Sequence, residues 1–280
     1  MIYFYVILSI ALIPILENFF DILKQSYSWW LVPLLIIGFF IAMVLIHLLF
    51  VVLNFRFMSY DTDPKKGQKY YRGLVNATIS LLVPLVRVNI NLSGMLPEEV
   101  PTDRKMMFVC NHQHDFDPAV IWHTFPNNDI GFIGKKEIYT TMPLIGRVMH
   151  KLHGLAIDRE NNREGAKTII KAINLIKEDT ASIAVFPEGY TSFQCELLPF
   201  RNGVFKIALK SKAPIVICAL SGTRQIPKRM LRKKTEVDFC ICGILYPEDY
   251  ENLNTNEIGE IVRSKMAAAL EKMRPGLAEQ

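Results

Sequence analysis

A histidine and an aspartate five positions apart, His112 and Asp117, are the residues of this sequence best suited to chemistry. They lie in a polar stretch between an apolar run, 106–110, that predicts a strand and an apolar stretch opened by Pro118 that predicts a helix. A turn there can fold the Asp117 carboxylate back onto one imidazole nitrogen. That contact would fix the tautomer and make the other nitrogen a better base. The pair therefore predicts a general base with its orienting carboxylate.

Two other interpretations of this stretch remain open. Asp117 could do no more than cap the following helix, with His112 as an ordinary loop histidine. A set of nearby imidazoles and carboxylates would also suit a metal-dependent hydrolase: His112, His114, Asp115 and Asp117. The His-x-His-x-Asp-His spacing of di-metal hydrolases is not met, because Phe116 and Asp117 stand where that pattern has Asp and His. We therefore predict no metal at this site.

Short apolar runs predict the strands that must position this pair. They cover residues 88–92, 106–110, 130–133, 155–157, 182–186, 215–220 and 237–244. Helix-like stretches lie between or after several of them, at 163–177, 203–212 and 257–273. Strands that alternate with helices form a mostly parallel sheet covered on both faces. We predict an α/β fold with a mostly parallel central sheet flanked by helices, and expect His112 at the carboxyl edge of that sheet, where ligands bind.

The N-terminal region has a different composition and predicts a membrane-anchoring helical hairpin. Residues 29–53 are apolar apart from His47 and are long enough to cross a bilayer, whereas 2–16 is short for a full crossing. No basic stretch precedes the first apolar run, so we expect no cleaved signal peptide. The predicted domains are 1–56, the membrane helices, and 57–280, the second domain.

The distribution of charge predicts that residues 57–280 lie on the cytoplasmic face of the membrane. Basic residues such as Arg56, Lys65 and Lys66 follow the long apolar segment, which fits the positive-inside rule. The five cysteines form no disulfide framework or metal-binding spacing, as expected in a reducing compartment. A formal net charge of +5 suits a protein that handles anions at an anionic membrane. Nothing beyond this mild basicity indicates a nucleic-acid partner.

Two further segments allow more than one interpretation. Residues 70–88 predict a connecting helix broken near Pro84, which would lie either at the bilayer interface or against the sheet. A run of basic residues follows the sixth predicted strand: Arg224, Lys228, Arg229, Arg232, Lys233 and Lys234. This run would meet anionic lipid headgroups or an acidic carrier protein, or it is a solvated loop.

Other polar clusters follow two of the predicted strands. Arg159 comes after 155–157, and an arginine can grip a phosphate through two N–H groups at once. Glu188 and Gly189 come after 182–186, and glycine lets a ligand approach the backbone closely. Each cluster also has a plain structural interpretation, as a surface ion pair of Arg159 or as an ordinary exit from a strand. Their position after strands places them at the same predicted edge as His112.

Taken in order, these stretches resemble the four motif blocks of the glycerolipid acyltransferase family, the 1-acylglycerol-3-phosphate acyltransferases. The blocks are Asn111-His112-Gln113-x3-Asp117, Gly154-x3-Asp158-Arg159, Phe186-Pro187-Glu188-Gly189 and Ala213-Pro214-Ile215-Val216. Two intervening segments, which begin at Gly134 and Leu198, are similar to family sequence as well. The resemblance covers roughly residues 80–225. One block alone would be weak evidence, but all four in order are specific.

The resemblance implies the reaction and the roles of individual residues. The family transfers a fatty acyl group from a thioester, acyl-CoA or acyl carrier protein, to the free hydroxyl of lysophosphatidic acid, which gives phosphatidic acid. No cofactor is implied beyond the acyl donor, and membrane lipids are expected partners. His112 would be the general base and Asp117 its orienting partner. The residues implied to bind the substrates are Arg159, Glu188, Gly189, Lys135, Arg201 and Lys206.

The sequence departs from the family pattern after Gly189. The third block usually continues with Thr-Arg, and that arginine is implicated in phosphate binding, whereas this chain has Tyr190 and Thr191. The charge of the acceptor must then fall on other basic residues, such as Arg159, Lys136 or Arg201, or the acceptor is a different lysolipid. Besides that second acceptor, a membrane-bound metal-dependent hydrolase and a non-catalytic lipid-binding protein remain as alternatives.

Overall fold

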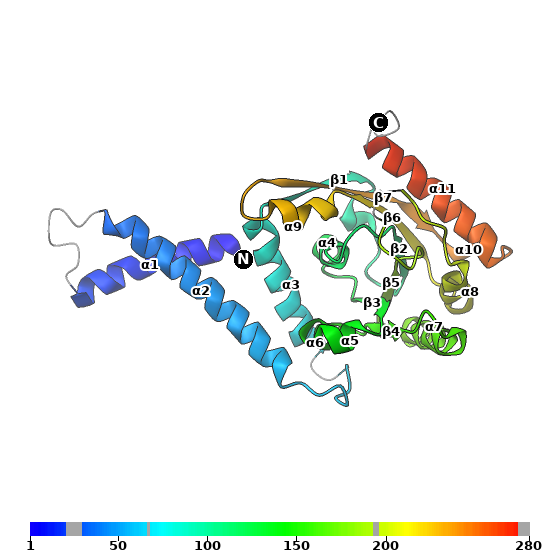
Figure 1. Cartoon of the computed structure of the whole chain (residues 1–280), viewed down its shortest axis with the longest axis horizontal. Coiled ribbons are helices and arrows are strands. Elements are labelled where there is room, and N and C mark those ends of the chain that lie inside the picture. The colour runs from blue at the N-terminus through cyan, green and yellow to red at the C-terminus, as the bar shows by residue number, and fades with distance from the viewer. Residues whose placement is uncertain (21–29, 66–67, 193–195, 274–280) are drawn as a thin grey trace.

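The computed structural model contains a seven-stranded sheet with helices on both faces, and two N-terminal helices project to one side of it (Figure 1). The structure describes residues 1–20, 30–65, 68–192 and 196–273. The strands are β1 Val88–Gly94, β2 Met107–Cys110, β3 Ile130–Lys135, β4 Leu155–Ile157, β5 Ser182–Val185, β6 Ile215–Ser221 and β7 Thr235–Leu245. Their order is β1-β7-β6-β2-β5-β3-β4, and every pair is parallel except β6 with β7. The predicted mostly parallel α/β sheet is confirmed.

The helices from residue 68 to the end of the described chain differ in length. The longer ones are α3 Gln68–Leu85, α4 Asp117–Thr124, α6 Pro143–Lys151, α7 Asn162–Lys177, α8 Lys206–Ser211 and α11 Thr255–Met273. Single turns are α5 Ile138–Thr141, α9 Ile226–Arg229, α10 Pro247–Tyr250 and the 3₁₀ turns η1 Pro97–Glu99, η2 Asn202–Phe205 and η3 Thr223–Gln225. The stretch predicted as one helix at 203–212 is therefore a 3₁₀ turn followed by a short α-helix.

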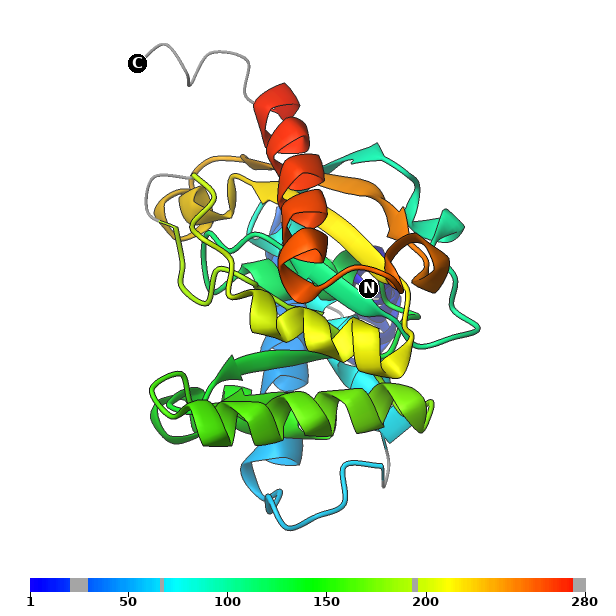
Figure 2. The same ribbon diagram turned by 90° about the vertical axis from the view of Figure 1, so that its right-hand side faces the viewer.

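Strand β6 shows how the sheet separates two apolar cores. Successive side chains of a strand point to opposite faces. Ile215 and Ile217 enter the core beneath α7, α8 and α11, the three helices nearest the viewer in Figure 2. Val216 and Cys218 enter the core beneath α4 and α6. Because β6 is buried on both faces, it is a continuous apolar run in the sequence, which is why it could be predicted.

The N-terminal helices α1 Ile2–Phe20 and α2 Leu31–Arg56 pack along each other and project from the domain (Figure 1). By length and composition α2 could cross a bilayer, and its outer face exposes Leu45, Ile46 and Leu49. The apolar part of α1, Ile2–Ile15, is shorter. Trp29, at the start of the predicted long segment, lies outside the described residues, as does Cys195. A hairpin of two membrane helices stays a prediction.

Helix α3 lies between the N-terminal helices and the sheet. It ends one residue after Pro84, close to the predicted break. The buried residues of α3 face two different partners. Leu81 packs against Tyr5 and Val44 of the N-terminal helices, whereas Leu74 packs against Leu152, which follows α6. Of the two predicted positions for this helix, the structure shows packing against the domain.

The connection from α2 to α3 is held to α6 through its backbone. Arg147 Nε donates to the carbonyl of Met58 at 3.0 Å, and Lys151 Nζ donates to the carbonyl of Asp63 at 3.1 Å. His150 Nε2 forms a further hydrogen bond, at 2.9 Å, with the carbonyl of Thr62. These bonds, together with the buried Phe55 side chain, fix the end of α2 on the domain.

Replacement of Phe55 by alanine should destabilise the whole domain. The Phe55 ring is fully buried, lies 5.2 Å from the ring of Tyr71 and belongs to the core that includes Leu74 and Leu152. Removal of a buried phenylalanine side chain costs about 3 kcal/mol or more of unfolding free energy, because a cavity remains. Thermal unfolding of the full chain in detergent would measure this as a lower Tm. Phe50→Ala is the matched control, since Phe50 is exposed on the same helix, and equal losses in both variants would contradict the predicted packing.

Candidate active site

Four chain segments meet at the carboxyl edge of the sheet. They are the loop after β2 with His112, the loop after β5 with Glu188, the residues after β4 with Arg159, and the end of β6 with Thr223. The strands β6, β2 and β5 are direct neighbours, so the loops that follow them come together although the sequence separates them widely. The predicted site residues His112, Asp117, Glu188, Gly189 and Arg159 all follow strands at this edge, as expected.

The histidine and aspartate form a direct hydrogen bond. His112 Nδ1 lies 2.8 Å from Asp117 Oδ2, and the side chains are 13% and 0% exposed. An ionised carboxylate only accepts hydrogen bonds, so Nδ1 carries the proton and Nε2 keeps its lone pair. Nε2 makes no hydrogen bond among the described residues. The geometry can therefore perform general base chemistry at Nε2.

The Asp117 carboxylate is held by three more donors. Its Oδ2 accepts the backbone N–H groups of Gln113 at 2.6 Å and His114 at 2.9 Å. Its Oδ1 accepts the hydroxyl of Thr223 at 2.5 Å. None of these donors belongs to helix α4, and Asp117 is the first residue of that helix rather than its N-cap, which corrects the expected position. The interpretation in which Asp117 serves only as a helix cap is therefore wrong.

Glu188 connects the loop after β5 to the backbone of the histidine. Its Oε1 accepts the backbone N–H of His112 and its Oε2 that of Leu198, both at 2.8 Å. Burial raises the pKa of Glu188 above its ordinary value, and the two N–H groups oppose that shift. The Phe186 ring stacks on the imidazole of His112 with 4.2 Å between the ring centres. Glu188 and Phe186 thus fix the backbone and the ring plane of the histidine.

Two amides of the His112 loop bind the end of β6. Asn111 exchanges two hydrogen bonds with the backbone of Leu220, at 2.9 and 2.8 Å, and Gln113 Oε1 accepts the N–H of Gly222 at 3.0 Å. With the Thr223 hydroxyl on Asp117, three side chains of the loop contact residues 220–223. This row of contacts fixes the loop on the neighbouring strand.

Two arginines contact the ring of one tyrosine. The guanidinium carbons of Arg159 and Arg201 are each 5.2 Å from the centre of the Tyr190 ring, and Arg201 Nη2 donates to the Tyr190 hydroxyl at 3.3 Å. Burial lowers the pKa of Arg159 from its ordinary value, and the charge of Arg201 acts in the same direction. Neither guanidinium forms an ion pair within the described part of the chain. Two positive charges held this close, without a carboxylate, form a site suited to a phosphate.

Gly189 sits directly beside this pair of arginines. Its φ of +75° belongs to the left-handed region, and a Cβ at this position would approach Arg201 Nε to 3.1 Å. A side chain here would be strained and would press on the guanidinium. Glycine thus leaves room for Arg201 to lie over Tyr190.

Two other predicted binding residues do not contact Arg159, Arg201 or Tyr190 through hydrogen bonds or ion pairs. Lys135 and Lys206 are exposed, and their side chains make no hydrogen bond or ion pair among the described residues. Lys136 is paired with Asp158 at 2.5 Å, which partly neutralises it. The positive charge of the site is therefore concentrated at Arg159 and Arg201.

The candidate metal ligands do not gather around a common point. His114 is stacked on Phe116 and its Nδ1 accepts the backbone N–H of that residue at 3.4 Å, while Asp115 is exposed. Asp117 is occupied by the donors described above. Across residues 1–20, 30–65, 68–192 and 196–273, no three His, Cys, Asp or Glu side chains form a group that could hold a metal ion.

Thr223 and Phe186 are functional positions whose roles the sequence did not predict. Phe186 belongs to the same motif block as Glu188, but in the sequence an aromatic residue at the end of an apolar run is indistinguishable from a core residue. Thr223 lies 106 positions after Asp117 and has no local pattern that links it to the histidine. Only the pairing of β2 with β6 brings Thr223 and Asp117 together.

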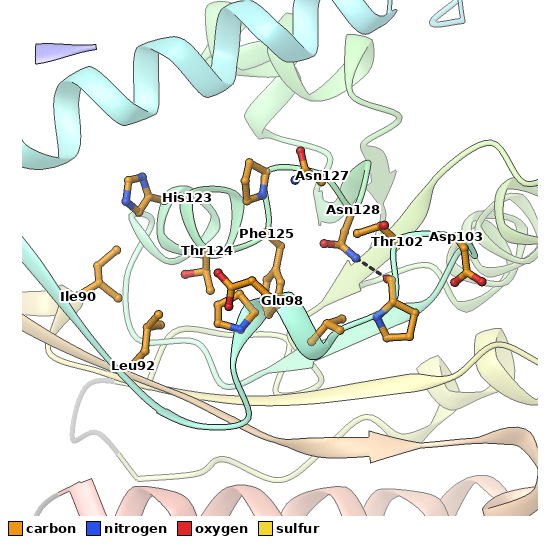
Figure 3. Close-up of a pocket in the computed structure, with 14 residues that line it drawn as sticks. Ile90, Leu92, Glu98, Thr102, Asp103, His123, Thr124, Phe125, Asn127 and Asn128 are labelled. Atoms are coloured by element: carbon orange, nitrogen blue, oxygen red, sulfur yellow. Dashed lines mark hydrogen bonds between the residues drawn. The ribbon is translucent and has the colours of Figure 1, made fainter. Parts of the chain in front are cut away.

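A hollow of about 720 Å³ on another part of the surface contains none of the predicted site residues. It lies between β1 and the end of α4, and Figure 3 shows Ile90, Glu98 and His123 around it. Asn128 donates to the carbonyl of Pro101 at its rim, at 2.8 Å. The size of a depression therefore does not locate the catalytic pair in this protein.

Comparison with known proteins agrees with this geometry. Residues 91–221 match the family model described as Acyltransferase, which includes the whole His112 loop and the end of β6. The matched segment of this chain is similar to the acyltransferase family. Residues 1–90 and 222–280 lie outside the match.

Several proteins similar to this chain are named 1-acyl-sn-glycerol-3-phosphate acyltransferase. The Saccharomyces cerevisiae protein is 30% identical over 183 residues, which are 63% of this chain and 59% of the yeast protein. The Limnanthes alba protein is 33% identical over 122 residues, 44% of this chain and 43% of that protein. The chain thus spans less than two thirds of the length of these relatives. The Haemophilus influenzae protein is 24% identical, covering 68% of this chain and 76% of its own.

A solved structure shares the fold of this chain. It is titled as the 1-acyl-sn-glycerophosphate (LPA) acyltransferase PlsC from Thermotoga maritima. The TM-score is 0.63 with 22% sequence identity, over 84% of this chain and 92% of that one. The similarity includes the arrangement of the sheet and its helices.

Removal of the Thr223 hydroxyl should slow acyl transfer without weakening substrate binding. Thr223→Val keeps the shape of the side chain and leaves Asp117 Oδ1 buried without its donor. A hydrogen bond to a charged group is worth about 1.5–3 kcal/mol, so we expect kcat to fall roughly tenfold or more with KM little changed. Thr223→Ser keeps the hydroxyl and should retain most of the rate. A valine variant with normal kcat, or a serine variant as slow as the valine one, would contradict this positioning role.

Proposed function

We propose that this protein transfers a fatty acyl group from a thioester donor to the free hydroxyl of lysophosphatidic acid, which gives phosphatidic acid. The observation that carries the proposal is the hydrogen bond from His112 Nδ1 to the buried Asp117 carboxylate, which leaves Nε2 to accept a proton. The names of the relatives support the same acceptor. The function corresponds to a 1-acylglycerol-3-phosphate O-acyltransferase.

The chemistry needs one base and one well-placed hydroxyl. His112 Nε2 takes the proton of the acceptor hydroxyl while its oxygen attacks the thioester carbonyl. Asp117 stabilises the imidazolium that forms. The carbon–sulfur bond then breaks, the thiolate leaves with the proton from His112, and an oxygen ester remains. A thiolate is a good leaving group, so positioning and deprotonation are the main tasks of the enzyme. No cofactor or metal takes part in this scheme.

We propose that the phosphate of the acceptor binds at Arg159 and Arg201. Both guanidiniums lie against Tyr190, and Gly189 leaves room beside Arg201. In this arrangement Arg201 provides a charge that the family pattern takes from the arginine after Gly-Thr. Glu188 supports the site through its hydrogen bond to the His112 backbone rather than through the phosphate, since two anions would repel.

The proposed location is a membrane, with the catalytic domain on its cytoplasmic face. Helix α2 has the length and composition to anchor there, and α1 would form the other arm of the hairpin. The division into membrane helices, 1–56, and a catalytic domain, 57–280, follows the charge distribution. The acceptor is itself a membrane lipid, so this placement brings enzyme and substrate together.

The test of the proposed function is acyl transfer by the detergent-solubilised full chain. Labelled long-chain acyl-CoA and acyl carrier protein would be offered as donors, with lysophosphatidic acid, glycerol 3-phosphate and neutral lysolipids as acceptors. We expect transfer to lysophosphatidic acid that falls by several orders of magnitude in His112→Ala, because the base is lost. Transfer only to another lysolipid would move the acceptor and keep the mechanism. Activity that survives in His112→Ala, or no transfer from either donor, would overturn the proposal.

The phosphate site has its own prediction. Arg201→Ala should raise the KM for lysophosphatidic acid about tenfold, because one hydrogen-bonded ion pair is lost, and should leave the KM for the donor near its original value. Lys206→Ala is the matched control, since Lys206 is an exposed cation without a partner among the described residues. Steady-state kinetics with each substrate varied in turn measure both effects. Equal changes in the two variants would argue against a phosphate site at Arg201.

A further inference from the structure

A loop rich in uncompensated positive charge follows the active site. We name residues 226–234, from α9 to the start of β7, the basic loop. Its exposed cations without an ion pair among the described residues are Lys228, Arg229, Arg232 and Lys233. Lys234 pairs with Glu236 at 2.9 Å. The basic loop contains no acidic residue, so its charge faces solvent without internal compensation.

One end of the basic loop is fixed to the end of α3, the helix that packs against the N-terminal helices. Arg87, the second residue after α3, donates from Nη1 to the carbonyl of Arg232 at 3.3 Å, and its own carbonyl accepts the N–H of Thr235 at 2.9 Å. Arg87 is exposed as well and adds a further cation. The end of α3 packs Leu81 and Leu85 into the cluster formed with α1 and α2. The basic loop thus borders the end of α3, which packs against α1 and α2 (Figure 1).

The other end of the basic loop is continuous with the active site. Thr223, which holds Asp117, lies in the turn immediately before α9. Its neighbour Arg224 donates to the carbonyl of Ser192 at 3.3 Å, and the N–H of Ser192 donates to the carbonyl of His112 at 2.8 Å. The basic loop therefore connects the catalytic edge with the N-terminal helices.

An exposed leucine stands among these cations. Leu231 is 68% exposed and has a φ of +64°, a conformation that bulky residues rarely adopt. A local turn supports it, since the N–H groups of Arg232 and Lys233 both donate to the carbonyl of Arg229, at 2.9 and 2.8 Å. An outward apolar side chain surrounded by Lys and Arg matches the boundary of an anionic bilayer, where cations meet headgroups and the apolar group meets acyl chains.

We propose that the basic loop docks on the surface of an anionic bilayer, with Leu231 at the boundary between headgroups and acyl chains. The attachment of the loop to the end of α3, which packs on α1 and α2, favours a lipid surface over an acidic protein, because those helices would hold the loop at the membrane. The proposal rests on the membrane placement of α1 and α2 proposed above. Docking would hold the catalytic edge at the height of the lipid headgroups.

The test places a fluorescent side chain at Leu231 in the full chain. Leu231→Trp protein would be reconstituted in nanodiscs of brominated phosphatidylcholine with or without phosphatidylglycerol, and the signal of the original chain subtracted. We expect quenching in the anionic discs that weakens in high salt, since salt screens the attraction. Ile170→Trp is the control position, because Ile170 is 56% exposed on α7, away from the N-terminal helices, and should not be quenched.

Charge-neutral variants test the role of the cations. Replacement of four loop cations by glutamine in the Leu231→Trp background should reduce quenching several-fold: Lys228, Arg229, Arg232 and Lys233. The matched control removes the same charge from α7 and should leave quenching unchanged: Arg163, Lys167, Lys171 and Lys177. Equal effects of the two sets would show an influence of net charge alone and overturn the proposal.

A third position separates this proposal from the membrane placement on which it rests. Ile46→Trp, at a residue 65% exposed on α2, reports insertion of that helix independently of anionic lipid. Quenching at position 46 without quenching at 231 would overturn docking and keep the membrane placement. Quenching at neither position would overturn both. A different result would identify the acyl carrier protein as the partner instead. In that case position 231 is never quenched, and neutralising the loop cations lowers the activity with acyl carrier protein but not with acyl-CoA.

Discussion

The buried Asp117 carboxylate is the constraint on which the catalytic edge depends. A carboxylate removed from water loses several kcal/mol of solvation unless donors replace the solvent. Here the donors are the imidazole, two backbone N–H groups of its own loop and the hydroxyl of Thr223. The first three are local, but Thr223 belongs to β6 and its following turn. The orientation of His112 therefore depends on the order of strands in the sheet, because only a β6 next to β2 brings Thr223 within reach.

Sequence reasoning succeeded where the signal was local. All the apolar runs predicted as strands are strands, and the signal is plainest for β2, β5 and β6, which are buried on both faces and therefore need unbroken apolar sequence. The link between His112 and Asp117 could be inferred because five positions in a turn bring side chains together. Thr223, the stack of Phe186 on the imidazole and the pairing of Arg159 with Arg201 depend on strand order, which no local pattern encodes. The split at 203–212 escaped prediction because a 3₁₀ turn and an α-helix share similar spacing.

The tyrosine after Gly189 changes how positive charge can be arranged. An arginine at that point would bring its own guanidinium to the site. Tyr190 instead offers a ring that both Arg159 and Arg201 contact, and the ring attracts each cation. Two like charges repel until an anion lies between them, so a phosphate gains from both guanidiniums and also relieves their repulsion. In the proposed phosphate site, the charges thus come from other segments than the one that carries Tyr190.

The proposed acceptor, lysophosphatidic acid in a bilayer, would impose a further requirement on this architecture. Its acyl chain is most stable in lipid, whereas its phosphate and hydroxyl must reach Arg159 and His112 at the edge of a folded domain. The edge must therefore stay at a fixed height above the bilayer. Helix α6 holds the connection after α2 by its backbone, and α3 packs against the N-terminal helices on one side and the domain on the other. These contacts hold the described parts of the connection, residues 57–65 and 68–85, against the domain and the N-terminal helices. With α1 and α2 in the bilayer as proposed, these contacts would let the position of the two helices determine the position of His112.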